Sequence, residues 1–377
     1  MNTREILGHF EGRHEAMLAA IADIVDVESP SYNVDQSKKV VDRIVEMFAA
    51  IPLELKVERE TAAGFGEHLV VRAFPSDRKS VLLLGHTDTV HPMGASEKNR
   101  TRIEDDRFFG CGIFDMKANI VLMIETLRYF AETGKRPANP INILLSCDEE
   151  VGSFTGKALV IREAAVSESC FVFEPSLDGR VKTARKGTGM FKLQVHGIPA
   201  HAGLEPEKGA SAILEISRQI ERLHKLNDPN EGTTVNVCTI KGGTTTNVIP
   251  EHAECEIDVR FASGDEAERV EKAIRSLEPI DKRVKLELTG EINRPPMERT
   301  PAVAALFEKA RQLGASFDYD LGEAQVGGGS DGNFVGVLGV PLLDGLGIAG
   351  AGAHTLHEHI LVSDIAHRAT LVTALLH

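Results

Sequence analysis

The sequence lacks the features of a disulfide-stabilised, secreted or membrane protein. Its five cysteines are an odd number, lie far apart in a chain of 377 residues and form no CxxC pair. Such cysteines are typical of reduced thiols, so we expect a cytoplasmic protein. No apolar run approaches the ~18 residues that a membrane-spanning helix needs. The charged, amphipathic segment 1–18 has no apolar core of the kind that a secretory signal carries.

Positive charge is also in short supply. The chain has 42 lysines and arginines against 56 aspartates and glutamates, a net charge of −14. No basic run is long enough to form a nucleic-acid-binding face. Hydrophobic residues make up 42% and charged residues 26%, which is typical of a globular protein, and the length suits two domains of ~100–200 residues each. We therefore expect small molecules or peptides as partners, and neither nucleic acid nor a membrane.

The order of the predicted elements indicates an α/β protein. Helices and short apolar strands alternate, with helices predicted over 3–27, 34–50 and 115–133 and strands over 81–84, 141–145 and 171–173. Apolar runs of this length suit strands that are buried on both faces of a parallel sheet. Their alternation with helices predicts a doubly wound α/β domain.

A second pattern occupies residues 185–294. Its predicted order is strand, helix, strand, strand, helix, strand, over 191–195, 208–226, 233–240, 253–261, 265–278 and 284–288. This is the β-α-β-β-α-β order of a ferredoxin-like split unit. We expect an inserted α+β domain at 185–294, within a catalytic domain made of residues 1–184 and 295–377.

Acidic residues and histidines follow the predicted strands. His86 and Asp88 follow the first strand, residues 148–150 (Asp-Glu-Glu) follow the second, Glu174 follows the third, and Asp115 opens a predicted helix. Taken singly, each has an ordinary alternative, such as a helix N-cap for Asp115. Together they would converge beyond the carboxyl ends of the strands, where unpaired carboxylates call for a cation. Imidazoles mixed with carboxylates suit Zn²⁺, Co²⁺ or Mn²⁺, and one of two adjacent glutamates could act as a general base.

The chain resembles the co-catalytic zinc aminoacylase/carboxypeptidase family over nearly its whole length. The motifs that carry the resemblance are GHTDTV at 85–90, GCGIFDMKA at 110–118, CDEEVGS at 147–153, FEPS at 173–176, IPAHAG at 198–203, TNVIP at 246–250, DVRF at 258–261 and GAHTLHE at 352–358. This family includes glutamate carboxypeptidases, acetylornithine deacetylase and succinyl-diaminopimelate desuccinylase. EEVGSFTGK at 149–157, FEPS, and GGGSDGN at 327–333 are most similar to the glutamate carboxypeptidases.

The resemblance implies a zinc-peptidase catalytic domain with an inserted lid domain that forms a homodimer. It implies two Zn²⁺ per chain, with Co²⁺ or Mn²⁺ as alternatives. The implied metal ligands are His86 and Glu174 for one ion, Glu150 and His354 for the other, and Asp115 as a bridge between them.

The resemblance also implies catalytic and substrate-binding residues. Glu149 would be the general base, Asp88 would support His86, and His201 of the lid would stabilise the oxyanion. The implied substrate contacts are Asn247 and Arg260 with a substrate carboxylate, and Gly329 and Ser330 along the pocket.

The expected activity is therefore hydrolysis of an amide bond next to a free carboxylate, as by a glutamate carboxypeptidase. An N-acyl amino-acid deacylase such as acetylornithine deacetylase is the main alternative, because it would differ only in the pocket. A di- or tripeptide aminopeptidase and a catalytically inactive binding protein on the same fold are more remote alternatives.

Overall fold

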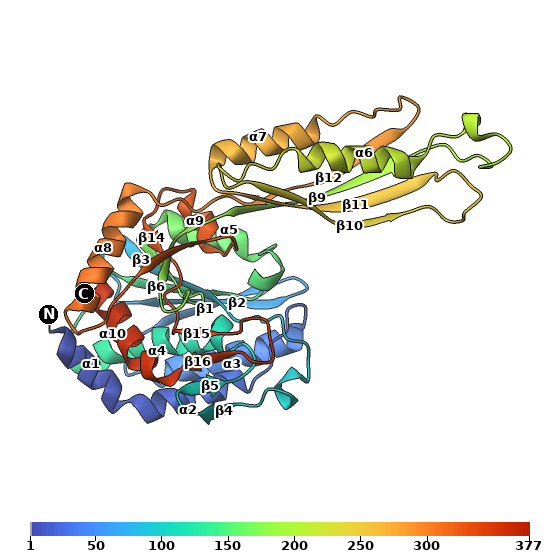
Figure 1. Ribbon diagram of the computed structural model, residues 1–377. Helices are drawn as coiled ribbons and strands as arrows, with labels where there is room; N and C mark the ends of the chain where they lie inside the picture. Colours follow the sequence, from blue (N-terminus) through green and yellow to red (C-terminus); the bar gives the residue numbers. More distant parts are fainter. Residues whose placement is uncertain (1) are drawn as a thin grey trace. The chain divides into compact units, whose positions relative to one another are not determined.

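The computed structural model describes residues 2–377, which form two compact units (Figure 1). The larger unit comprises the chain up to Ala184 together with Arg299–Gln325 and Ser330–His377, and the smaller unit comprises Arg185–Glu298 and Val326–Gly329. The chain thus returns to the larger unit a few residues after the predicted boundary at 294.

A six-stranded mixed sheet forms the centre of the larger unit. Its strands, in the order β1-β2-β6-β3-β7-β14, are β1 (Lys56–Ala62), β2 (Gly66–Ala73), β6 (Ile141–Ser146), β3 (Ser80–His86), β7 (Ser167–Val172) and β14 (Leu342–Leu343). The last four strands are parallel, and β1 and β2 form an antiparallel hairpin at one side. Every residue of β3 and β6 is buried, as expected for strands with helices on both faces. The predicted α/β fold class is confirmed.

Helices lie on both sides of this sheet (Figure 1). They are α1 (Thr3–Gly12), α2 (His14–Val25), α3 (Val34–Ala49), α4 (Ala118–Thr133), α5 (Gly156–Ala165), α8 (Pro301–Ala315), α9 (Gly332–Gly336) and α10 (Ile365–Leu376). The single helix predicted over 3–27 is wrong, because the chain leaves helical geometry at Arg13 (φ −102°, ψ 5°). Arg13 donates two hydrogen bonds to Glu125 of α4, while Phe10 and Met17 on either side of the break are both fully buried.

The helix predicted over 115–133 begins later than expected. Residues Ile113–Lys117 form an irregular turn in which Asp115 (φ −120°, ψ 88°) is not helical, and α4 follows. Its end agrees with the prediction, since Gly134 caps it in the left-handed region with φ 67°. Asp115 is therefore not a helix N-cap.

The smaller unit is a four-stranded antiparallel sheet with two helices. Its strands, in the order β10-β11-β9-β12, are β10 (Thr234–Gly242), β11 (His252–Phe261), β9 (Gly187–His196) and β12 (Lys285–Arg294), and its helices are α6 (Ala212–His224) and α7 (Gly264–Arg275). The helices pack on one face of the sheet (Figure 1). This strand order is that of the predicted ferredoxin-like unit.

The described chain also contains several short strands. They are β4 (Arg102–Glu104), β5 (Arg107–Phe109), β8 (Val181–Arg185), β13 (Glu323–Val326), β15 (Gly350–Ala351) and β16 (His359–Leu361). β16 pairs with β5 and with β15, which brings the segment 352–358 beside the turn that contains Asp115. The five cysteines are free, and only Cys238 is exposed. None of the helices in residues 2–377 is long and apolar enough to cross a membrane.

Candidate metal centre

The acidic residues and histidines that follow the strands lie at one edge of the sheet. His86 is the last residue of β3, which runs parallel to both β6 and β7. The short helical turn Glu149–Val151 comes after β6, and Glu174 comes after β7. Because parallel neighbours end at the same edge, these side chains converge, as the sequence pattern predicted.

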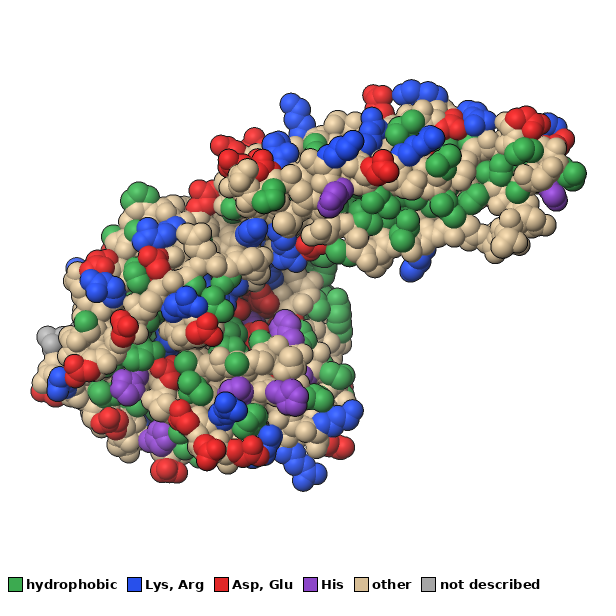
Figure 2. Space-filling model, viewed as in Figure 1, with side chains coloured by type: hydrophobic (Ala, Val, Ile, Leu, Met, Phe, Trp, Pro, Cys, Tyr) green, Lys and Arg blue, Asp and Glu red, His purple; other side chains and the backbone are tan. Residues whose placement is uncertain are grey.

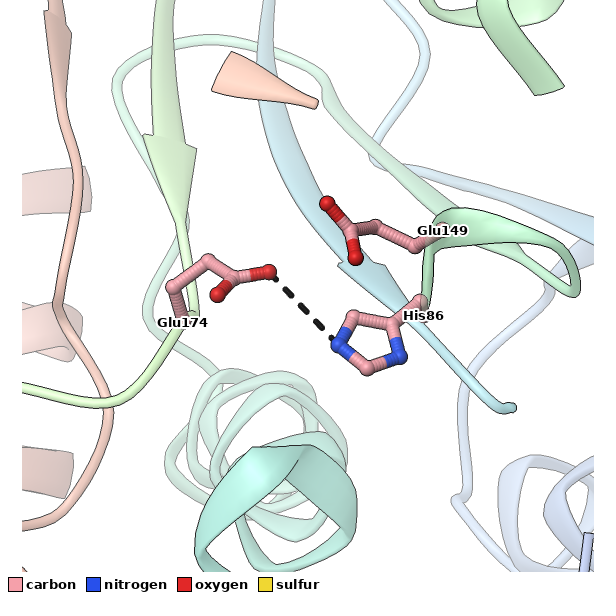
Figure 3. A group of neighbouring side chains, drawn as sticks. All are labelled: His86, Glu149 and Glu174. Carbon is pink, nitrogen blue, oxygen red and sulfur yellow. Dashed lines mark ion pairs between the residues drawn. The ribbon is translucent and has the colours of Figure 1, made fainter. Parts of the chain in front are cut away.

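One group of side chains gathers around His86. Its Nε2 lies 3.2 Å from Asp115 Oδ1 and 3.5 Å from Glu174 Oε1. Figure 3 shows Glu149 together with His86 and Glu174. Potential ligand atoms of these three residues all lie within 4.8 Å of one another.

A second group gathers around His354. Its Nε2 lies 3.2 Å from Glu150 Oε2 and 3.3 Å from Asp115 Oδ2. Asp115 therefore turns one carboxylate oxygen to His86 and the other to His354. The side chain of His354 is 52% exposed, whereas that of His86 is 1% exposed, so the second group is the more open of the two.

The donor atoms of this centre fit divalent cations. Among the described residues, Glu150 Oε1 is a buried oxygen without a hydrogen-bond partner. A buried oxygen of this kind is costly unless a proton or a cation satisfies it. Imidazole nitrogens together with carboxylate oxygens suit Zn²⁺, and also Co²⁺ and Mn²⁺. The arrangement can therefore hold metal on either side of Asp115.

The charged groups of the centre shift one another's protonation. Burial alone would lower the pKa of His86, but Asp115, Asp88 and the other carboxylates outweigh burial and hold that pKa well above its usual value. The carboxylates of Asp115 and Glu150 raise the pKa of His354 to about 10. Burial would raise the pKa of Asp115, but hydrogen bonds with the imidazoles of His354 and His86 outweigh burial and lower that pKa. At Glu150 burial prevails, and the pKa is raised. Metal binding would displace the protons that the imidazoles hold.

Asp88 contacts both His86 and the turn that follows β6. The Nδ1 of His86 lies 2.9 Å from the backbone carbonyl of Asp88 and 3.5 Å from its carboxylate. A proton on Nδ1 leaves Nε2 free as a ligand atom. The Asp88 carboxylate also accepts the backbone N–H groups of Glu149 (3.1 Å) and Glu150 (3.2 Å) and the hydroxyl of Ser31 (2.8 Å). It thereby holds the turn that carries both glutamates.

His201 and Asn247 lie close together within the smaller unit. The backbone N–H of Ala202 donates to the carbonyl of Asn247 at 2.9 Å. His201 is exposed, and its Nδ1 accepts the N–H groups of Gly203 and Leu204, each at 3.2 Å. Nδ1 is therefore the acceptor in the neutral imidazole, so Nε2 carries the hydrogen and is available as a donor.

Arg260 lies at the other end of the same sheet. It pairs with Thr188 at the start of β9, whereas His196 and His252 pair at the opposite end, next to the segment that carries His201. Eight residues along β11 span about 26 Å at ~3.3 Å per residue. The guanidinium of Arg260 is held by Asp258, with Nη2 2.8 Å from Oδ2. Within one smaller unit, Arg260 is thus remote from His201 and Asn247.

The structure does not support a pocket-lining role for the side chain of Ser330. This residue is fully buried, and its hydroxyl donates to Asp344 at 2.6 Å. It also accepts the N–H of Gly332 at 3.1 Å, so it fixes the start of α9. The carbonyl of Gly329 accepts a hydrogen bond from Arg185 at 3.3 Å.

Sequence reasoning overlooked two residues that support the centre, Ser31 and Glu358. Ser31 donates to Asp88, and the buried carboxylate of Glu358 accepts the backbone N–H of Asp115 at 2.9 Å. Glu358 lies four positions after His354 in the GAHTLHE motif, which is the only signal the sequence offers for it.

Comparisons with known proteins find relatives over most of this chain. The model of peptidase family M20/M25/M40 matches residues 82–377. Carboxypeptidase G2 from Pseudomonas sp. (strain RS-16) is 30% identical over 335 residues, which cover 86% of this chain and 80% of that protein. A succinyl-diaminopimelate desuccinylase from Paracidovorax citrulli (strain AAC00-1) is 27% identical over 328 residues, which cover 81% of this chain and 80% of that protein.

The fold is similar to that of solved structures. Aminopeptidase PepT from Bacillus cereus ATCC 10987 has a TM-score of 0.77 at 22% sequence identity, and the match covers 96% of this chain and 98% of that chain. At this level of identity the likeness concerns the fold alone.

Proposed function

The chain belongs to peptidase family M20/M25/M40 and is a metal-dependent hydrolase, and we propose that it cleaves an amide bond next to a free carboxylate, as a glutamate carboxypeptidase does. The observation that carries this proposal is the Asp115 carboxylate, with one oxygen facing His86 and the other facing His354. We propose two Zn²⁺ per chain, with His86 and Glu174 as ligands on one side, Glu150 and His354 on the other, and Asp115 as the bridge.

The reaction would combine these ions with groups of the chain itself. Bound there, the cations would make a water molecule acidic and polarise the substrate carbonyl. Glu149 would take the proton of the attacking water and return it to the departing amine. The Nε2–H of His201 would donate to the oxyanion as its charge develops. Arg260 would pair with the free carboxylate through its planar guanidinium.

Three aromatic rings beside the centre favour a substrate with a bulky acyl group. Tyr32 and Phe154 are 62% and 66% exposed, and Phe65 lies between them at ring-centroid distances of 5.1 and 6.3 Å. Tyr32 directly follows Ser31, which donates to Asp88, and Phe154 follows the turn that carries Glu149. Exposed rings grouped in this way offer a surface on which an aromatic or large apolar group can stack.

The test of the proposed function is hydrolysis by metal-free protein that has been reconstituted with Zn²⁺ or Co²⁺. We expect turnover of N-acyl glutamates, faster with a benzoyl than with an acetyl group, and none before metal is added. Turnover of acetylornithine or succinyl-diaminopimelate alone would favour the deacylase alternative, which the 27% identical desuccinylase supports. Two bound metals without hydrolysis of any substrate in the panel would favour an inactive binding protein.

Replacing Arg260 should weaken substrate binding without loss of metal. We expect Arg260→Ala to raise KM for N-acyl glutamates about ten- to a hundred-fold, which corresponds to the ~1.5–3 kcal/mol of a hydrogen bond to a charged group. Steady-state kinetics and metal analysis measure the two quantities separately. Asp258→Asn is the matched control, because it removes the negative charge beside the guanidinium and leaves Arg260 in place. Equal turnover of free and amidated substrates by the wild-type protein would contradict the proposed carboxylate contact.

We propose that the smaller unit also forms a homodimer. β10 is an edge strand of its sheet, so one side of its backbone has no partner among the strands of residues 2–377. Ile240 on this strand is 55% exposed, and Ile213 and Leu214 of the adjacent α6 are 40% and 51% exposed. Figure 2 shows hydrophobic side chains gathered over the side of the smaller unit where β10 lies. An exposed edge flanked by apolar side chains suits pairing with a second copy.

A further inference from the structure

The carboxylate of Glu358 is fully buried and accepts four hydrogen bonds. Oε1 accepts the backbone N–H groups of Phe114 and Asp115, each at 2.9 Å. Oε2 accepts the backbone N–H of Gly112 at 2.8 Å and lies 2.6 Å from His91 Nε2. The side chain is 0% exposed, so these donors replace the water that a carboxylate would otherwise bind.

This carboxylate joins the segments that carry the candidate ligands. The turn 112–115 ends at Asp115 and wraps around the Glu358 side chain. His91 lies shortly after Asp88 on the segment that follows β3, and Glu358 itself belongs to the segment that carries His354. Gly112 has a φ of 71°, and a Cβ at that position would lie 2.5 Å from a methyl carbon of Thr89, so this turn packs closely against the segment after β3.

We infer that Glu358 is a positioning residue that sets the direction of the Asp115 carboxylate, an inference that rests on the proposed bridging role of Asp115. The backbone of Asp115 is not helical, so no helix hydrogen bond fixes its N–H. Glu358 supplies the acceptor instead. With its backbone held in this way, Asp115 presents one oxygen to His86 and the other to His354.

Both carboxylate oxygens of Glu358 are necessary for this role, because each accepts hydrogen bonds. A glutamine at this position could accept two N–H groups through its carbonyl oxygen, but its amide group would face the Gly112 N–H and the His91 ring. His91 could change tautomer, whereas a backbone N–H can only donate. Glu358→Gln would therefore leave a buried donor unpaired on the Gly112 side of the turn, while the shape of the side chain stays the same.

Cobalt binding tests the inference without relying on activity. Co²⁺ is added to metal-free wild-type and Glu358→Gln proteins, and the affinity and the visible absorption spectrum are recorded. We expect Glu358→Gln to bind Co²⁺ about 10- to 100-fold more weakly, as is typical when a residue that supports a ligand is replaced, and to show a changed spectrum. The spectrum reports the geometry around the ion, which a loss of global stability alone would not alter.

The smaller unit offers a matched control, Glu215. Its buried carboxylate accepts the backbone N–H groups of Ile280 (2.8 Å) and Asp281 (3.0 Å), yet that unit holds none of the candidate ligands. We expect Glu215→Gln to lower thermal stability and to leave Co²⁺ affinity and spectrum unchanged. A folded Glu358→Gln protein with the affinity and spectrum of wild type would overturn the inference.

A milder variant covers the case in which Glu358→Gln does not fold. His91→Phe replaces the imidazole by an apolar ring and leaves the three backbone donors, so we expect a spectral change in the same direction but smaller. An unchanged spectrum in this folded variant would then overturn the inference. If wild-type protein binds Co²⁺ but hydrolyses no substrate, the proposed function fails while the effect of Glu358 is still measured. If wild-type protein binds no Co²⁺, both fail.

Discussion

Glu149→Gln should keep its metal and lose most of its activity. Glutamine has the size of glutamate but cannot take a proton from water, so we expect kcat to fall by about 10²- to 10⁴-fold. Metal analysis of the same preparation should still find two ions per chain. This result would separate a base from a ligand, which matters because Glu149 lies close enough to His86 and Glu174 to be a third ligand on that side (Figure 3).

The neighbouring residue provides the control for this prediction. Glu150 sits on the same short turn, its Oε2 lies 3.2 Å from His354, and its Oε1 is the buried oxygen without a partner among the described residues. Glu150→Gln should therefore weaken metal binding, and its activity should recover in part when metal is in excess. If Glu149→Gln instead loses metal and Glu150→Gln retains it, the two glutamates have exchanged roles.

The position of the candidate centre could be predicted because it follows from local patterns. β3, β6 and β7 are each encoded as short apolar runs, and each is followed within a few residues by a histidine or an acid. Parallel order then brings the three strand ends to one edge of the sheet. Periodicity and the residue type after each strand were sufficient, with no knowledge of contacts between distant residues.

Asp115 shows where local patterns fail. Sequence analysis placed it at the start of a helix, yet α4 begins at Ala118 and Asp115 lies in the irregular turn before it. The acceptor of its backbone N–H is Glu358, 243 positions further along the chain. No periodicity and no short motif encodes a contact over that separation. The break at Arg13 has a similar cause, because the ion pair of Arg13 with Glu125 spans 112 positions.

The sheet register of the smaller unit limits how its residues can act together. Sequence analysis expected Asn247 and Arg260 to contact the same substrate carboxylate. Asn247 lies beyond the end of β11 where His252 pairs with His196, whereas Arg260 pairs with Thr188 at the opposite end. The separation of about 26 Å along the strand exceeds the reach of one small substrate. If both residues contact one substrate, we therefore expect them to come from two chains.

The same register leads to the last prediction, that His201 acts on a site whose metal ligands belong to the partner chain. His201 lies beside Asn247, as the hydrogen bond from Ala202 shows, so it is equally remote from Arg260 of its own chain. Suppose that Glu149→Ala and His201→Ala proteins are each inactive, and that they are unfolded together in equal amounts and refolded. Half of the dimers should then be mixed, and in each mixed dimer one site would combine an intact Glu149 with an intact His201 from the partner.

About a quarter of all sites should therefore recover wild-type activity, since a two-fold dimer exchanges equivalent contacts. Glu149→Ala mixed with Asn247→Ala should recover to the same extent, because Asn247 and His201 share one end of the sheet. Glu149→Ala mixed with Arg260→Ala is the matched control. If Arg260 serves the site of its own chain, every site in that mixture keeps one lesion, and activity at low substrate concentration should not recover. If verified mixed dimers of Glu149→Ala and His201→Ala have no activity, His201 works within its own chain. The substrate carboxylate would then contact only one of Asn247 and Arg260.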